Sequence, residues 1–130
     1  MNMETVEIKA FVPARDFELS KAFYTDLGFE VAYSSEDLAY LKAGECAFLL
    51  QALYVKEHAT NFMMHMLVED VDAWWRHVED AGLVTKYGIR ADPPADRPWA
   101  IRDFVIVDPS GVLWRIGTNI GSPANPKETP

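Results

Sequence analysis

Two segments of the chain share one pattern: DFELSKAFYTDLG at residues 16–28 and DVDAWWRHVEDAG at residues 70–82. Each begins with Asp, has a second Asp ten residues later, and ends with Gly two residues after that. Asp suits a helix start because its carboxylate accepts hydrogen bonds from the first turn, and Gly suits the position just beyond a helix end. Apolar residues recur between these ends at helical spacing. The pattern therefore predicts two amphipathic helices of about three turns.

A β-rich stretch precedes each helix and three follow it, so a strand–helix–strand–strand–strand order occurs twice. The expected strands are residues 6–12, 29–34, 37–42 and 45–51, then 62–68, 83–86, 100–107 and 112–117. The predicted fold class is α+β, built from two βαβββ modules at about residues 5–54 and 61–118. Both modules belong to one domain of residues 1–120. Residues 121–130 contain three prolines and no apolar periodicity, which predicts a disordered tail.

Composition excludes several classes of protein. The net charge of −8 argues against nucleic-acid binding, which depends on Lys and Arg at phosphates. It favours a cationic partner, although acidity also simply keeps a protein soluble. Cys46 is the single cysteine and cannot form an internal disulfide, which fits a reducing cytoplasm. No apolar run approaches the roughly 18 residues of a membrane span, and no export signal is visible.

Two longer stretches carry a family resemblance. PARDFELSKAFYTDLGF at residues 13–29 and PWAIRDFVIVDPSGVLWRI at residues 98–116 resemble the vicinal-oxygen-chelate superfamily. That superfamily includes glyoxalase I, extradiol dioxygenases, fosfomycin-resistance enzymes and bleomycin-resistance proteins. The resemblance implies an open mixed barrel with a cleft shared between the two modules. Similarity to the bleomycin-resistance type also implies a homodimer that binds a small molecule.

Metal-dependent members of this superfamily place His or Glu at four strand positions. In this chain the resemblance puts those positions at Lys9, Leu49, Met63 and Arg115. Lys and Arg have no free lone pair at neutral pH, Leu has no donor atom, and a lone Met suits soft copper. His65 lies two residues beyond Met63, but a catalytic zinc needs about three protein ligands. We therefore expect no metal and no other cofactor.

Strand alternation separates a core face from a mixed face. The expected core face holds Ile8, Ala10 and Val12; Cys46, Phe48 and Leu50; Met64, Met66 and Val68; and Val112, Trp114 and Ile116. On this face Cys46 is expected to be an inert, buried thiol. The mixed face supplies the candidate ligand-binding residues Glu7, Lys9, Phe11, Leu49, Gln51, Met63, His65, Asp103 and Arg115. The alternative for Lys9 and Arg115 is a role only as ion-pair partners of Glu7 or Asp103, and the alternative for His65 is a role only as a hydrogen-bonded wall residue.

Trp99 completes the candidate set. It follows a loop at residues 88–98 that contains three prolines, at the place where bleomycin-resistance proteins have a Trp near the drug. Its indole either stacks on a flat ligand or pins its own loop.

The leading hypothesis is a metal-free binding protein that sequesters a cationic or aromatic drug-like ligand in an acidic cleft, without catalytic residues. The alternative is a metal-independent enzyme of the same superfamily, with Lys9 or His65 as base and Arg115 holding an anion. A third possibility is a regulatory domain whose cleft is vestigial.

Overall fold

The two predicted helices are present in the computed structural model, which describes residues 1–121. Helix α1 (Phe17–Leu27) begins at Asp16, whose carboxylate accepts a hydrogen bond from the Leu19 amide at 3.1 Å, and ends at Gly28 with a φ of +132°. Helix α3 (Val71–Asp80) begins in the same way at Asp70, which caps the Ala73 amide at 3.1 Å. The repeated Asp therefore has the same capping role in both modules.

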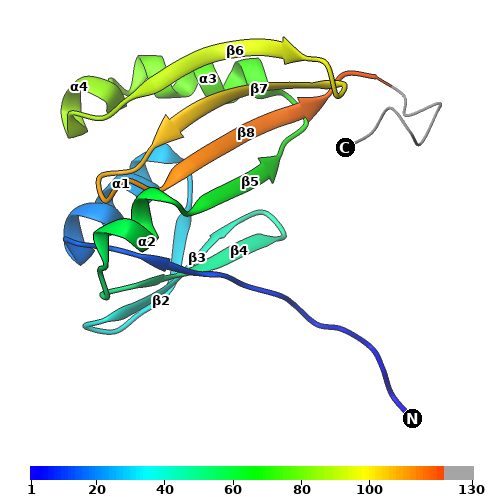
Figure 1. Ribbon diagram of the computed structural model, residues 1–130. Helices are drawn as coiled ribbons and strands as arrows, with labels where there is room; N and C mark the ends of the chain where they lie inside the picture. The colour runs from blue at the N-terminus through cyan, green and yellow to red at the C-terminus, as the bar shows by residue number, and fades with distance from the viewer. Residues whose placement is uncertain (122–130) are drawn as a thin grey trace.

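Two four-stranded sheets accompany these helices (Figure 1). The first has the order β1-β4-β3-β2 and comprises β1 (Phe11–Pro13), β2 (Glu30–Ser34), β3 (Leu38–Ala43) and β4 (Cys46–Gln51). The second has the order β5-β8-β7-β6 and comprises β5 (Met63–Leu67), β6 (Ala91–Arg97), β7 (Ile101–Val107) and β8 (Leu113–Asn119). The first strand of each module pairs parallel with its last, and the remaining pairs are antiparallel. This confirms the α+β class; the two sheets do not close into a barrel.

One face of each sheet packs against the helices and forms a common core. Of the residues expected there, the structure buries Val12, Phe48, Leu50, Met66, Val112, Trp114 and Ile116. Phe23, Tyr24 and Leu27 of α1 are fully buried against them. The core therefore contains residues of both modules. In the described part of the chain, no helix has the length and apolarity to cross a membrane.

A polar network links the first module to the β7–β8 turn of the second. The Tyr24 hydroxyl donates to Asp108 Oδ2 and accepts from Trp114 Nε1 at 2.8 Å. Asp108 also accepts the backbone amides of Ser110 and Val112. Burial raises the pKa of both Tyr24 and Asp108, and their partners compensate for the lost hydration. The turn therefore holds α1 from the other half of the molecule.

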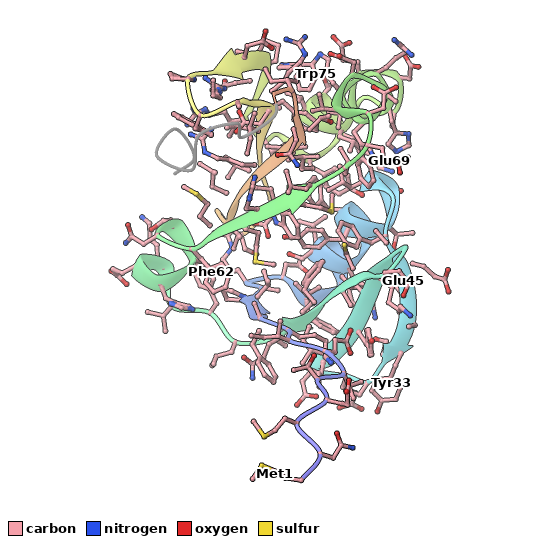
Figure 2. All side chains as sticks on the ribbon, turned by 90° about the vertical axis from the view of Figure 1, so that its right-hand side faces the viewer. Met1, Tyr33, Glu45, Phe62, Glu69 and Trp75 are labelled. Atoms are coloured by element: carbon pink, nitrogen blue, oxygen red, sulfur yellow. The ribbon has the colours of Figure 1, made fainter. Side chains whose placement is uncertain are left out.

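The first predicted strand is largely wrong. Residues 6–12 were expected to form it, but β1 begins only at Phe11, and Val6 and Ile8 are 98% and 95% exposed. The preceding residues leave the body of the molecule as an extended segment (Figure 1), with Met1 at its far end (Figure 2). Ile8 therefore does not join the core. Cys46, at the start of β4, is exposed rather than buried, because β1 pairs with β4 only at Leu49, Leu50 and Gln51.

The second module differs from expectation between its helix and its final hairpin. Residues 83–86 form helix α4 (Leu83–Tyr87) rather than a strand, because Gly82 and Gly88 adopt left-handed backbone angles at its two ends. The prolines of residues 88–98 predict a loop, yet most of these residues form β6. This is an edge strand whose register shifts between Asp92 and Ala95, and edge strands and bulges tolerate proline. The short helix α2 (Lys56–Thr60) had no signal in the sequence analysis. Apart from Gly121, the predicted tail lies outside the described residues.

Candidate functional site

The open face of the first sheet, on the side away from the helices, carries five of the predicted residues. Phe11 pairs with Leu49 across β1 and β4, and Gln51 follows two residues along. Phe11 is 52% exposed, while Leu49 and Gln51 are half-buried. Glu7 and Lys9 approach this face from the segment before β1.

Glu7 and Lys9 form an ion pair with 2.6 Å between Lys9 Nζ and Glu7 Oε1. The Tyr40 hydroxyl, on β3, donates to Glu7 Oε2 at 2.8 Å. The hydrogen bonds from Lys9 and Tyr40 lower the pKa of Glu7, so this carboxylate is ionised at neutral pH. Lys9 is thus an ion-pair partner of Glu7. Tyr40 was missed, although alternation along the strand at residues 37–42 places it on the face of the candidate residues.

The open face of the second sheet carries another four predicted residues. His65 of β5 lies directly opposite Arg115 of β8, and Met63 lies opposite Leu113. Met63 is 57% exposed and His65 is also exposed. Asp103 of β7 lies opposite Gly117 of β8 and is only 1% exposed.

Asp103 lies between two arginines. Arg97 Nε donates to Asp103 Oδ1 at 2.8 Å, and Arg115 Nη1 lies 3.3 Å from Asp103 Oδ2. Arg115 is thus an ion-pair partner of Asp103. Arg97 is missing from the predicted set, because the prolines around it predict a loop. A Cβ added at Gly117 would lie 2.9 Å from Asp103 Cβ. The missing side chain at residue 117 therefore gives Asp103 its space.

Trp99 lies in the three-residue turn between β6 and β7, two residues after Arg97, and is 37% exposed. The next residue, Ala100, has a φ of +64°, and its amide donates to the Arg97 carbonyl at 3.2 Å. Trp99 therefore lies at the end of the second sheet where β6 turns into β7. Partial exposure leaves a ring face available to a ligand.

The predicted site residues thus form two groups, one on each open face. Their polar contacts stay within each group: Glu7 with Lys9 and Tyr40, and Asp103 with Arg97 and Arg115. A separate slot of about 270 Å³ lies between the facing edges of β4 and β5, with lining residues that include Cys46, Met66 and Trp114. Of the predicted ligand-binding residues, only His65 lines this slot.

The residues present do not fit a divalent metal. The four family ligand positions fall on Lys9, Leu49, Met63 and Arg115, and two of these side chains are engaged in ion pairs. Among residues 1–121, no group of three or more His, Cys, Asp or Glu side chains is placed to hold a metal ion. No reaction step is therefore assigned to a metal here.

The fold defines a class of protein: a paired βαβββ domain whose open sheet faces present mixed polar and apolar side chains. A profile of the Glyoxalase/Bleomycin resistance protein/Dioxygenase superfamily matches residues 7–116. The chain belongs to this superfamily.

Solved structures agree with this assignment. A bleomycin-binding protein complexed with bleomycin is 26% identical, with a TM-score of 0.76 over 88% of this chain and 99% of the other. The bleomycin-binding protein of Streptomyces verticillus, complexed with copper(II)-bleomycin, is 23% identical, with a TM-score of 0.72 over 92% and 100% of the two chains. Lactoylglutathione lyase from Agrobacterium tumefaciens is 18% identical, with a TM-score of 0.66 over 90% and 96%. No curated protein matches the chain.

Proposed function

We propose that this protein is a metal-free binding protein of the bleomycin-resistance type, which sequesters a drug-sized, aromatic or cationic ligand. The observation that carries the proposal is the exposure of apolar side chains on the sheet faces that lie away from the helices of residues 1–121. Phe11, Met63 and Leu67 are 52%, 57% and 48% exposed. Apolar walls with a few placed polar groups are typical of small-molecule sites.

We propose that the protein is a homodimer in which the open faces of two copies lie against each other. Within one chain the two groups of site residues make no polar contact with each other among the described residues. Val6 and Ile8 of the N-terminal segment are almost fully exposed, which is costly for a lone chain in water. A second copy covering these residues would remove that cost and enclose a cleft. We also place the protein in the cytoplasm.

Charge supports a cationic ligand at long range. The net charge of −8 would steer a cation toward the protein and raise the association rate, an effect that salt weakens. Asp92 lies on the edge strand β6 opposite Val105, on the open face, with a side chain 45% exposed. Glu7 stays ionised on the other open face. Asp92 and Glu7 are the carboxylates that we propose for the cleft.

Calorimetric titration with metal-free bleomycin, at low and at moderate salt, tests the proposal. We expect submicromolar binding near one drug per chain, weaker at the higher salt. Trp99→Ala is expected to weaken binding by about tenfold, and Trp99→Phe by less, because a stacked ring contributes about 1–3 kcal/mol. The absence of saturable binding would overturn the drug assignment. Metal analysis of purified protein that finds a divalent ion near one per chain would favour an enzyme instead.

A further inference from the structure

We propose that the open face of the second sheet binds an anionic group of the ligand, a carboxylate or a phosphate, between Arg97 and Arg115. The argument starts from a charge count. Two guanidinium groups share the single carboxylate of Asp103. These three side chains together carry one positive charge, in a chain whose net charge is −8.

The two arginines keep donors for a ligand. A guanidinium has five N–H donors, and the contacts with Asp103 engage Nε of Arg97 and Nη1 of Arg115. The side chains of Arg97 and Arg115 are 28% and 32% exposed, so solvent and solutes reach them. Asp103 itself is 1% exposed and does not offer its carboxylate to a ligand. An anion on this face therefore contacts the two arginines rather than Asp103.

The aspartate also holds the arginines in place. It lies against Gly117, where a Cβ would come within 2.9 Å of its own Cβ, and it contacts one arginine on each side. Fixing long side chains before binding removes part of the entropy cost of ordering them. Planar guanidinium groups held in this way suit the oxygens of a carboxylate or phosphate.

The other acidic residues of β6 do not cancel this charge. Asp96 pairs with Arg102 at 3.1 Å, and Arg102 also contacts Asp72 of α3 at 3.0 Å, so this cluster lies on the helix side of the sheet. Asp92 lies opposite Val105 on the same face as Arg115, but it pairs with Arg90 at 2.6 Å, so these two residues together add no net charge. Distant acids are screened beyond about 8 Å at physiological salt, so contact with the two arginines dominates once a ligand is bound.

This inference rests on the proposed function in one respect, namely that the face receives a small molecule, and it names a chemical group of that molecule. The test uses two probes of the same shape and opposite charge, 1-naphthoate and 1-naphthylmethylamine. Each is titrated into the full chain while NMR follows the Nε–H signals of the arginines. We expect 1-naphthoate to shift the signals of Arg97 and Arg115 and to bind more tightly than the amine. Equal or tighter binding of the amine would overturn the inference.

Three variants and one control make the test specific. We expect Arg97→Gln and Arg115→Gln each to weaken naphthoate binding by about five- to tenfold, because each loses a charge-assisted contact. Arg102→Gln removes the same charge from the helix side and should leave binding unchanged. Asp103→Asn keeps one acceptor but removes the competing charge, so it should strengthen binding, whereas a purely structural role predicts no gain. If circular dichroism shows that Arg97→Gln or Arg115→Gln does not fold, the test of the anion site rests on the other of these two variants and on Asp103→Asn.

The two proposals fail separately. Naphthoate binding that follows this pattern, with no binding of bleomycin, would overturn the drug assignment and support the anion site. Binding of bleomycin with no difference between the two naphthalene probes would support the drug assignment and overturn the anion site.

Discussion

At the scale of single residues, the hydroxyl of Tyr24 joins two modules. Tyr24→Phe leaves Trp114 Nε1 without its acceptor and removes one donor from the buried Asp108. We expect the free energy of unfolding to fall by about 1–3 kcal/mol, as for other unsatisfied buried groups. Urea denaturation measures the change. Tyr33→Phe is the control because Tyr33 is 59% exposed, and unchanged stability of Tyr24→Phe would contradict the role assigned to the network.

Asp26 gives a pH-dependent prediction at the same scale. Its carboxylate accepts from Lys86 Nζ at 2.7 Å and from the Tyr87 hydroxyl at 2.6 Å, and these bonds lower the pKa of Asp26. In the same cluster, burial and the bond to Asp26 raise the pKa of Tyr87 to about 12. A lowered carboxyl pKa contributes stability that is complete above the unfolded value, about 3.9, and is lost as the pH falls through the folded value.

Asp26→Asn should therefore destabilise the protein at pH 7, and the difference from wild type should shrink as the pH falls below about 4. Urea denaturation at pH 7, 5 and 3 follows this difference. Glu36→Gln, at an exposed acid in the β2–β3 turn, should show little difference at any pH. A difference for Asp26→Asn that does not change with pH would mean that packing, not charge, carries the effect.

At the scale of elements, the β6–β7 turn has a strained residue. Ala100 has a φ of +64°, a region that costs a residue with a Cβ roughly 1–2 kcal/mol. Ala100→Gly relieves this cost but adds freedom to the unfolded chain, so we expect a net gain of about 0.5–1 kcal/mol. Thermal unfolding measures it. Ala95→Gly, within β6, should lower stability instead, and a loss in both variants would contradict the turn geometry.

Gly117 belongs to the packing of β7 against β8. An added Cβ would lie 2.9 Å from both Asp103 Cβ and Ile101 Cγ2, so Gly117→Ala should cost about 1–3 kcal/mol. Combining it with Ile101→Ala removes one of these contacts, and the double variant should be more stable than the sum of the single effects predicts. Additive effects in urea denaturation would show that the close approach is not responsible.

The elements also show what the sequence can predict. The capped helices and the central strands followed from Asp, Gly and apolar spacing, because these signals act within a few residues. The alternation of β4, β5 and β8 placed Leu49, His65 and Arg115 on open faces for the same reason. Whether residues 6–10 join a sheet depends on distant partners, and Ile8 left the core although its local pattern fits a strand. Arg97 was missed because a proline-rich edge strand has no local signal that separates it from a loop.

At the scale of the whole molecule, we expect a concentration-dependent homodimer. Ile8→Asp should weaken dimerisation by roughly tenfold or more, since burying a large aliphatic side chain contributes about 1.5–3 kcal/mol. Sedimentation velocity over a range of concentrations measures the change. Leu53→Asp, at a residue 60% exposed on the connection after β4, is the control. A wild-type protein that stays monomeric at all concentrations would remove the basis for a cleft between copies.

The bond between Tyr24 and Asp108 also bears on how the protein is made. Its two partners are 84 positions apart in the chain. At 5–20 residues per second, a ribosome takes roughly 4–17 s to add that much chain. During this interval Asp108 is not yet available to the Tyr24 hydroxyl. The apolar face of α1 also lacks the residues of the second module that bury it. We therefore expect the nascent first module to expose apolar surface to chaperones and to aggregation until the second module is made.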